Sequence, residues 1–344
     1  MSGKSYTSMH KKLIKMLTFC LLVPMLLYCL YSYQFTRGSL GRKYQQQTIS
    51  TMQATAQAIS SYMSIADHTA RSLHYNQDIL EVLALNGQNI SPSRQRSITS
   101  QLFRYMQQLY GVVPDATQIH IDAYRLRRIL LLTDTFQQYE KEHIYLQSER
   151  TVSTIPYETY VLPTHMQYDY NFTNTELDTY SLVVTLVLPL YRTPSDSELI
   201  GKLSIDIPIE VLGQMCAGLY DSQETFYLLD SQQNILFSSD PELTATATRS
   251  SKLHRLCSQA AQTSGMVIDR SDSQWYFCAP ISEAPLDWYM VKTTPASYVY
   301  RDADQFFRHS LAVLMLSILA ALSCSFFIIV RQTRPLRQLT RYTH

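Results

Sequence analysis

Residues 180–191 read YSLVVTLVLPLY, and residues 199–207 read LIGKLSIDI. The first stretch is rich in β-branched residues and the second alternates apolar and polar side chains, so both predict β-strands. Residues 194–197 (PSDS) supply turn-forming side chains between them. The two stretches predict a long antiparallel hairpin, with Asp206 near the end of its second strand. Pro208 follows, and it predicts the start of a short helix.

The same signals recur on either side of this hairpin. Upstream, residues 118–123 and 128–133 predict two strands, and residues 94–110 predict a helix. Downstream, a helix is expected from Asp240 towards Gln262. Five further strands are expected at residues 225–230, 235–239, 266–270, 274–282 and 286–294. This order of elements predicts an α+β fold of two units, each an antiparallel sheet with helices on its faces.

Residues 134–178 show neither a helical nor a strand period. The segment is polar and rich in tyrosine, at Tyr139, Tyr145, Tyr157, Tyr160, Tyr168 and Tyr170. Aromatic side chains with a few polar tips suit a small-ligand site. Ordinary packing of the domain explains the same tyrosines, and the sequence leaves both interpretations open.

A long helix is predicted ahead of these units, because neither glycine nor proline occurs between Gly41 and Gly87. Apolar residues recur there at alternating steps of three and four. They are Ile49, Met52, Ala56, Ile59, Met63, Ala66, Ala70 and Leu73. This stripe fits either a two-stranded coiled coil or packing on the chain's own globular domain.

Two apolar runs flank the predicted units. Residues 311–330 (LAVLMLSILAALSCSFFIIV) carry no charge, and at about 1.5 Å per residue they span roughly 30 Å, the thickness of a hydrocarbon core. Residues 16–35 form the other run, after a basic segment over residues 1–15. We favour a retained transmembrane helix there over a cleaved signal peptide, because the run is long and ends in interfacial tyrosines. The basic flanks then place both termini in the cytoplasm and the central domain outside.

Composition excludes several functional classes. The net charge is +1, so no broad basic surface is expected for nucleic acid. Nine glycines, with no Gly-x-Gly, argue against dinucleotide-binding and phosphate-binding loops. No nucleophile motif of the Gly-x-Ser-x-Gly type and no His-x-x-x-His pair is present, so we expect no catalytic residues, metal site or cofactor in this chain.

The six cysteines fall into two groups. Three lie within the apolar runs, and Cys216, Cys257 and Cys278 lie in the central domain. Their spacing does not match a metal site. A Cys257–Cys278 disulfide and free buried thiols are both compatible with the sequence.

At these motifs the chain resembles the double Cache (PAS-like) sensor domains of bacterial receptors, over about residues 40–305. The resemblance rests on LIGKLSIDI ahead of a helix, on residues 226–230 (FYLLD) followed by 234–239 (NILFSS), and on Pro280-Ile281 leading to residues 287–291 (DWYMV). Residues 333–339 (TRPLRQL) look like the start of a HAMP linker, in which a proline breaks the membrane helix just inside the cell. Together these features resemble the input half of a sensor histidine kinase of the Firmicute two-component type.

The resemblance implies two transmembrane helices flanking an extracytoplasmic double Cache domain with a long N-terminal helix. The implied segments are a cytoplasmic N-terminus (1–15), a first span (16–35), a signalling helix (36–75), a membrane-distal unit (76–216), a membrane-proximal unit (217–300), an exit helix (301–310), a second span (311–330) and the start of HAMP (331–344). The kinase domain would lie beyond this chain. His344 is too close to the membrane to be its phosphorylated histidine.

In Cache receptors the ligand sits between the sheet of the distal unit and its long strand-to-strand connection. By that resemblance Tyr145, Tyr168, Tyr170 and Asp206 are candidate ligand-binding residues, and Asp206 matches a position where an aspartate can hold a ligand amine. Alternatively, Asp206 faces solvent or caps the helix after Pro208. The Arg-x-Trp-Tyr signature of amino-acid-binding members is absent from the membrane-distal unit, because both tryptophans lie in the membrane-proximal unit (217–300).

The partners implied are an unknown extracellular small molecule, the lipid bilayer, a second copy of the chain and a cognate response regulator. Pro335 and Leu336 are the expected relay residues on the cytoplasmic side. A chemotaxis or cyclase-type receptor with the same input domain is the main alternative. A membrane-anchored outer enzyme is the remaining one.

Overall fold

The computed structural model describes residues 3–142, 158–167, 181–192, 199–244, 246, 250–271, 273–282 and 286–342. The chain divides into two compact units. The first unit combines Met1–Gln47 with Ala296–His344, and the second is Thr48–Pro295. Helix α1 (Gly3–Arg71) contributes residues to both.

The helices that open the second unit pack through one apolar stripe. After α1 come η1 (Ser72–Tyr75), α2 (Gln77–Leu83), η2 (Gly87–Asn89) and α3 (Pro92–Tyr110). The predicted stripe is buried at Met52, Ile59, Met63, Ala66, Ala70 and Leu73. Ile49 and Ala56 are half-buried. The stripe therefore packs on the chain's own domain.

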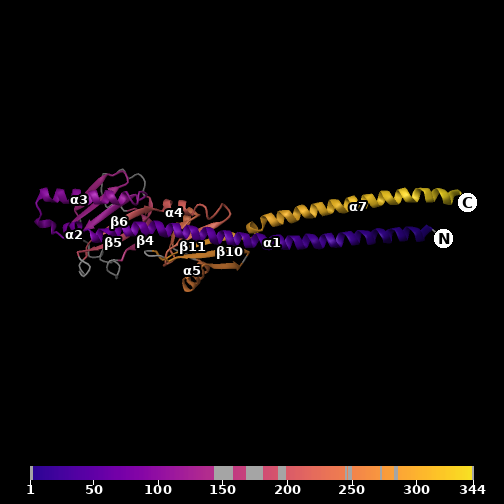
Figure 1. Ribbon diagram of the computed structural model, residues 1–344, viewed down its shortest axis with the longest axis horizontal. Helices are drawn as coiled ribbons and strands as arrows, with labels where there is room; N and C mark the ends of the chain where they lie inside the picture. Colours follow the sequence, from indigo (N-terminus) through magenta and orange to yellow (C-terminus); the bar gives the residue numbers. More distant parts are fainter. Residues whose placement is uncertain are drawn as a thin grey trace. The chain divides into compact units, whose positions relative to one another are not determined.

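Six antiparallel strands form a first sheet, named sheet A, in the order β3-β2-β1-β6-β5-β4 (Figure 1). They are β1 (Gln118–Ala123), β2 (Arg128–Thr133), β3 (Gln138–Glu142), β4 (Tyr160–Met166), β5 (Leu182–Tyr191) and β6 (Leu199–Pro208). The predicted hairpin of β5 and β6 is confirmed, and β6 also pairs with β1. In this register Gln118 and Thr185 both lie opposite Asp206.

The expectation of irregular structure throughout residues 134–178 is wrong in two places. β3 and β4 lie in that segment and form the two edges of sheet A. β3 (QYEKE) is highly charged, and β4 (YVLPTHM) contains Pro163 and a register shift between Leu162 and His165. Edge strands favour charge, proline and bulges, so neither segment shows a clean alternation of apolar residues.

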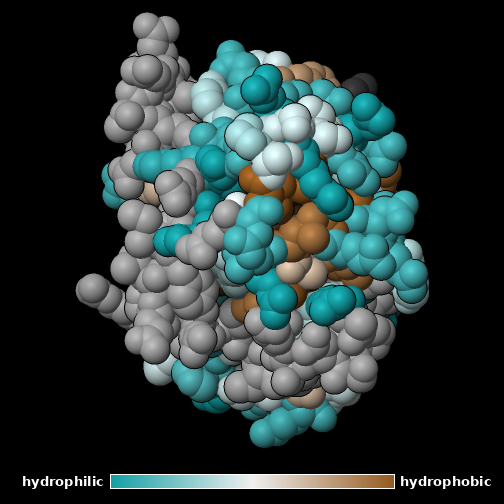
Figure 2. All heavy atoms as spheres, turned by 90° about the vertical axis from the view of Figure 1, so that its left-hand side faces the viewer, coloured by the Kyte–Doolittle hydropathy of each residue, from teal (hydrophilic) through white to brown (hydrophobic). Residues whose placement is uncertain are grey.

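The two faces of sheet A differ in chemistry. Ile119, Ile121, Leu130 and Leu132 are buried on the face that packs against α3. Between α3 and β2 lies a small hollow of about 10 Å³, room for roughly one water molecule, that opens to solvent. Its lining is Gly87, Ile90, Gln95, Ile98, Thr99, Leu102, Leu126, Arg128 and Leu130. Figure 2 shows the side of the molecule that lies at the left of Figure 1, where hydrophobic side chains are exposed between hydrophilic ones.

Five antiparallel strands form a second sheet, sheet B, in the order β8-β7-β11-β10-β9. They are β7 (Thr225–Leu229), β8 (Ile235–Ser238), β9 (Val267–Ser271), β10 (Gln274–Ile281) and β11 (Trp288–Pro295). Helix α4 (Ile209–Cys216) leads into this part of the chain from β6 and packs on β8. Pro208 is the N-cap of α4 rather than its first helical residue.

Helix α5 (Ser251–Thr263) covers one face of sheet B. The helix predicted from Asp240 is wrong at its start. Asp240 caps only a short 3₁₀ turn, η4 (Pro241–Leu243), and α5 begins later, where the Ser250 hydroxyl accepts a hydrogen bond from the Leu253 amide. Both serine and aspartate satisfy free amides at helix starts, so the sequence offers two start signals close together.

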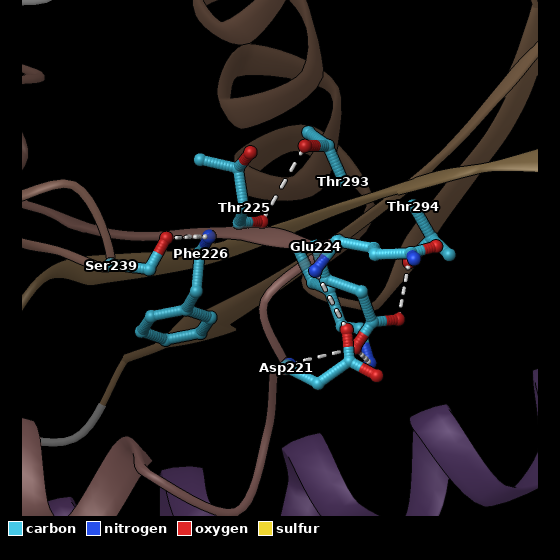
Figure 3. A network of polar contacts seen from close by, with 9 residues as sticks. Asp221, Glu224, Thr225, Phe226, Ser239, Thr293 and Thr294 are labelled. Carbon is cyan, nitrogen blue, oxygen red and sulfur yellow. Dashed lines mark hydrogen bonds and ion pairs between the residues drawn. The ribbon is translucent and has the colours of Figure 1, made fainter. Parts of the chain in front are cut away.

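The other face of sheet B holds a polar network (Figure 3). Lys292 Nζ lies 2.9 Å from Glu224 Oε2, and the Thr294 hydroxyl donates to Glu224 Oε1 at 2.9 Å. The Asp221 amide donates to Glu224 Oε2 at 3.2 Å. Glu224, Lys292 and Thr294 are all buried. The network ties the segment before β7 to β11, the strand that leads out of the second unit.

The first unit pairs the N-terminal part of α1 with α6 (Ala296–Val299) and α7 (Arg301–Tyr342). Figure 1 shows α1 and α7 side by side. The Tyr33 hydroxyl donates to Asp304 Oδ1 at 2.8 Å, and its ring lies 4.7 Å from that of Phe307. The Arg37 guanidinium stacks 4.3 Å from the centre of the Tyr300 ring.

Within the described residues, one helical segment is long and apolar enough to cross a membrane, Arg301–Cys324 in α7. It overlaps the second predicted span. Residues 16–35, the first predicted span, are helical as part of α1. The predicted helix break at Pro335 is wrong, because α7 continues through Pro335 and Leu336 to Tyr342. A proline removes a single backbone donor, and a helix can continue past it with that one hydrogen bond missing.

Candidate functional site

The central strands of sheet A present a row of polar side chains on the face opposite α3. Strand alternation places Gln118, His120 and Asp122 of β1 on this face, next to Asp206, Ser204 and Lys202 of β6. Thr185 of β5 extends the row. All of these side chains except Lys202 are buried. These seven residues are called the polar face.

Asp206 is the centre of the polar face, with its side chain fully buried. The Gln118 side-chain amide donates to Asp206 Oδ2 at 2.6 Å, and the Thr185 hydroxyl donates to Oδ1 at 2.6 Å. Both donors come from the strands on either side of β6, at the directly opposed positions. The sheet register therefore fixes this carboxyl group from two sides.

His165 extends the network towards the edge of the sheet. Its Nε2 lies 3.3 Å from the Thr185 hydroxyl and its Nδ1 lies 2.9 Å from the carbonyl oxygen of Pro163. Since Thr185 donates its hydrogen to Asp206, the two ring contacts are both hydrogen bonds only when both ring nitrogens carry hydrogen. The register shift of β4 brings His165 opposite Val183, two residues from Thr185 along β5 and on the same face of the sheet.

A second charged pair lies further along the same face. Lys202 Nζ lies 3.0 Å from Asp122 Oδ2, and these residues are opposed in the register. The Asp122 side chain is 2% exposed and that of Lys202 is 23% exposed, so the pair is partly buried. His120 lies between this pair and the Gln118–Asp206 contact along β1.

Burial sets the protonation states of Asp206 and His120. Burial raises the pKa of Asp206 above its ordinary value, and the hydrogen bonds from Thr185 and Gln118 oppose that rise. Burial also lowers the pKa of His120 well below its ordinary value, and Lys202 and then His165 add to the effect. His120 is therefore neutral at physiological pH.

This arrangement suits the binding of a cationic group. An ionised carboxylate has about four acceptor positions, and the two donors from Gln118 and Thr185 use only two of them. Lys202 is already paired with Asp122. Among the described residues there is no cluster of three or more His, Cys, Asp or Glu side chains that could hold a metal ion.

Of the predicted ligand-binding residues, Asp206 lies at the centre of the polar face. It neither faces solvent nor caps α4, whose N-cap has no side-chain hydrogen bond. Tyr145, Tyr168 and Tyr170 lie outside the described residues. The sequence did not single out Gln118, Thr185 or His165. The polar positions in the alternation of residues 118–123 were a usable signal for Gln118, but its contact with Asp206 depends on strand order.

Neither family models nor curated proteins match the sequence of this chain. Solved structures match its fold. The periplasmic sensory domain of the Campylobacter jejuni chemoreceptor Tlp1 matches with a TM-score of 0.57 and 10% identity, over 76% of this chain and 98% of that one. The ligand-binding domain of the Campylobacter jejuni chemoreceptor Tlp3 in complex with L-valine matches with a TM-score of 0.50 and 16% identity, over 77% and 98%.

At these identities the similarity concerns the fold. The chain has the fold of a Cache-type sensory domain, and the predicted α+β architecture with a long N-terminal helix is confirmed.

Proposed function

We propose that this chain is the input half of a membrane receptor that binds a small molecule outside the cell. The observation that carries the proposal is the buried Asp206 carboxyl group, held by two neutral donors at the middle of the polar face. The ligand carries a cationic amine, which the Asp206 carboxylate binds. The similar ligand-binding domain of Tlp3 was solved in complex with L-valine, which contains an ammonium group.

The receptor crosses the membrane twice in this proposal. The spans are residues 16–35 and the apolar part of α7, and the second unit lies outside the cell. The support is the pattern of charge: lysines precede the first apolar run and arginines follow the second. Tyr33 and Arg37 on α1 contact Asp304 and Tyr300 near the start of α7, at the outer ends of the proposed spans.

Chain connectivity supplies a route for the signal. Asp206 lies on β6, which continues into α4, and α4 packs on β8 with Gly213 against the Phe237 ring. The segment after α4 leads to Glu224, whose ion pair with Lys292 reaches β11. β11 ends at Pro295 and is followed at once by α6 and α7. A ligand-induced shift of β6 would therefore bias the position of the exit helix.

The output that we propose is a two-component histidine kinase, with a HAMP linker beginning near Pro335 and Leu336. Residues 333–339 support this choice, although α7 does not break at Pro335. The receptor would act as a homodimer with a cognate response regulator. A chemotaxis receptor is the second candidate, and the observation that favours it is that the two similar sensory domains belong to chemoreceptors.

Thermal-shift measurements test the binding site. The full chain in lipid nanodiscs is screened against primary amines, amino acids, sugars and organic acids. An amine or amino acid should raise the unfolding temperature of the wild type, and Asp206→Asn should abolish the shift. Asp269→Asn is the matched control, because Asp269 forms only partly exposed ion pairs on sheet B. Stabilisation of Asp206→Asn by the same ligand would contradict the proposed role of Asp206.

Fusion proteins separate the two outputs. Residues 1–344 are joined to the HAMP and kinase domains of one receptor, or to the signalling domain of a chemoreceptor. Ligand-dependent phosphorylation in the first fusion and no response in the second would favour the histidine kinase. The reverse pattern would favour the chemotaxis receptor.

A further inference from the structure

Two cysteines that lie far apart in the sequence meet in the core of the second unit. Cys257 lies on α5 and Cys278 on β10, and both are fully buried. They belong to one apolar cluster between the helix and sheet B. Its members are Leu229, Ile235, Leu253, Leu256, Cys257, Ala260, Cys278, Tyr289 and Val291. Cys216 is also buried, on α4, but it is not a member of this cluster.

Cys257 and Cys278 are free thiols in this structure, and the two thiols are in direct contact. They form a hydrogen bond with each other, and both act on the Tyr289 hydroxyl beside them. The hydrogen bond lowers the pKa of Cys257 and raises that of Cys278. Cys257 is therefore the more readily ionised of the two, and the thiolate is the nucleophilic form of cysteine.

Outside this cluster, α5 also contacts β10 through Lys252, whose ammonium group lies 3.9 Å from the centre of the Tyr276 ring. At the rim, Lys252 and Arg255 of α5 lie 3.9 Å and 3.4 Å from Asp269 of β9. These pairs are partly exposed, and such pairs contribute little stability. The Cys257–Cys278 contact joins the middle of the helix to the middle of the neighbouring strand.

We infer that Cys257 and Cys278 are joined by a disulfide bond in the mature protein, which fixes α5 to β10. The inference rests on the proposed function in one respect, because that function places both residues in an oxidising compartment outside the cytoplasm. Sequence alone left the pair open, since spacing does not reveal which thiols meet. The structure brings them together from a helix and a strand that face each other.

The chemistry balances with an external oxidant. During folding, before burial, the thiolate of one of the two cysteines attacks the disulfide of a two-cysteine thiol oxidase, which forms a mixed disulfide and leaves one thiolate on the oxidase. The thiolate of the other cysteine then attacks the mixed disulfide and releases the oxidase as a dithiol. Overall two S–H bonds break and one S–S bond forms, two protons are released, and two electrons pass to the oxidant.

With this bond, sheet B would have a structural role and sheet A would bind the ligand. The bond closes a loop of about 20 residues and locks α5 over the apolar face of sheet B. That face then cannot open to admit a ligand, which agrees with the proposed binding surface on sheet A.

Differential alkylation of the full chain tests the bond. Membranes are quenched in acid, denatured and alkylated with one maleimide, then reduced and alkylated with a second. Cys257 and Cys278 should both carry only the second label, and the unreduced peptide pair should weigh less by two hydrogen atoms. Cys216→Ser is the matched control and should leave this result unchanged. First-label alkylation of both residues would overturn the inference.

A thermal measurement extends the test to folding. Reductant should lower the unfolding temperature of the wild type and of Cys216→Ser by roughly 5–10 °C. The double variant Cys257→Ala/Cys278→Ala should not respond to reductant. A wild type that is equally insensitive to reductant would overturn the inference.

A topology control keeps this inference apart from the proposed function. Ser222 is exposed, so Ser222→Cys in the Cys216→Ser background can be labelled with a membrane-impermeant maleimide on intact cells. If Cys at position 222 is labelled from outside while Cys257 and Cys278 are found as free thiols, only the inferred disulfide is overturned. If Cys at position 222 is not labelled from outside while Cys257 and Cys278 are found as a disulfide, only the proposed topology is overturned.

Discussion

Sheets A and B share an antiparallel architecture with a helix on one face, but their central strands differ in what they bury. Sheet A buries Gln118, His120 and Asp206 on the face that α3 does not cover. Sheet B buries apolar residues beneath α5 and keeps its polar residues on the opposite side. Both sheets thus bury apolar residues beneath a helix and polar residues on the opposite face, and they differ in which polar groups they hold there.

The buried charges of the two sheets also differ in how they are compensated. On sheet B, Glu224 meets the ammonium group of Lys292 at 2.9 Å and accepts from Thr294. On sheet A, Asp206 meets two neutral donors. A buried carboxylate stabilised by a neighbouring cation is a structural element. Asp206 is hydrogen-bonded by neutral donors, with His165 favouring its ionised form from further away. This difference supports the proposal that sheet A is the binding sheet.

Removal of the sheet B cation should have the largest effect on stability. Lys292→Met leaves the Glu224 carboxylate buried without its cation, which should cost about 3–5 kcal/mol in the free energy of unfolding. Urea unfolding of the full chain in nanodiscs, followed by tryptophan fluorescence, measures this cost. Adding Glu224→Gln should recover a large part of it, because the unbalanced charge is removed. A loss below 1 kcal/mol for Lys292→Met would show that the ion pair is not structural.

A substitution on sheet A should disturb its strand pairing more selectively. In Gly201→Ala the added Cβ would overlap the backbone carbonyl oxygen of Asp122 on β1. Backbone cannot move aside as a flexible side chain does, so we expect a loss of about 1–3 kcal/mol and weaker ligand binding. Gly218→Ala is the matched control, since its Cβ would meet nothing within 4 Å. Equal stability of the two variants would contradict the close approach of β1 and β6.

The sequence predicted the strands of sheet B and the central strands of sheet A, and it missed the two edge strands of sheet A, for one physical reason. Residues 118–123 alternate and residues 129–132 are continuously apolar because these strands are buried in the core, and the observed β1 and β2 have the predicted bounds. β3 and β4 lie at the edges of sheet A, where no such constraint acts. At the site, Asp206 could be predicted, but its partners Gln118 and Thr185 could not. Their contacts depend on strand order and register, which the alternation of one strand does not encode.

Acid should destabilise sheet A through His120. The pKa of this buried imidazole is lowered well below its ordinary value of 6.5. Below pH 6.5 the unfolded chain therefore binds a proton that the folded chain does not, and stability falls as the pH falls. The loss should be about 1.4 kcal/mol per pH unit at most, and His120→Gln should remove it. His254→Gln changes an exposed histidine on α5 and should retain the acid dependence, whereas an unchanged dependence in His120→Gln would contradict the prediction.

Asp206 should show the smallest effect and the opposite sign of pH dependence. Its pKa is raised by burial, so as the pH rises above the ordinary value of 3.8 the unfolded chain ionises before the folded chain does. The folded state loses stability over that window, because the unfolded state then binds fewer protons. Ligand-free Asp206→Asn should therefore be slightly more stable than the wild type at pH 7 and no more stable below pH 3.8.

With an amine bound at pH 7, the wild type should be more stable than Asp206→Asn. The amine compensates the Asp206 charge as Lys292 compensates Glu224 in sheet B. Chemical unfolding with and without ligand measures both differences. A ligand-free Asp206→Asn variant that is less stable than the wild type at pH 7 would mean that the hydrogen bonds from Gln118 and Thr185 outweigh the cost of burial. Asp206 would then be a structural residue, and the contrast between the two sheets would no longer indicate a binding site.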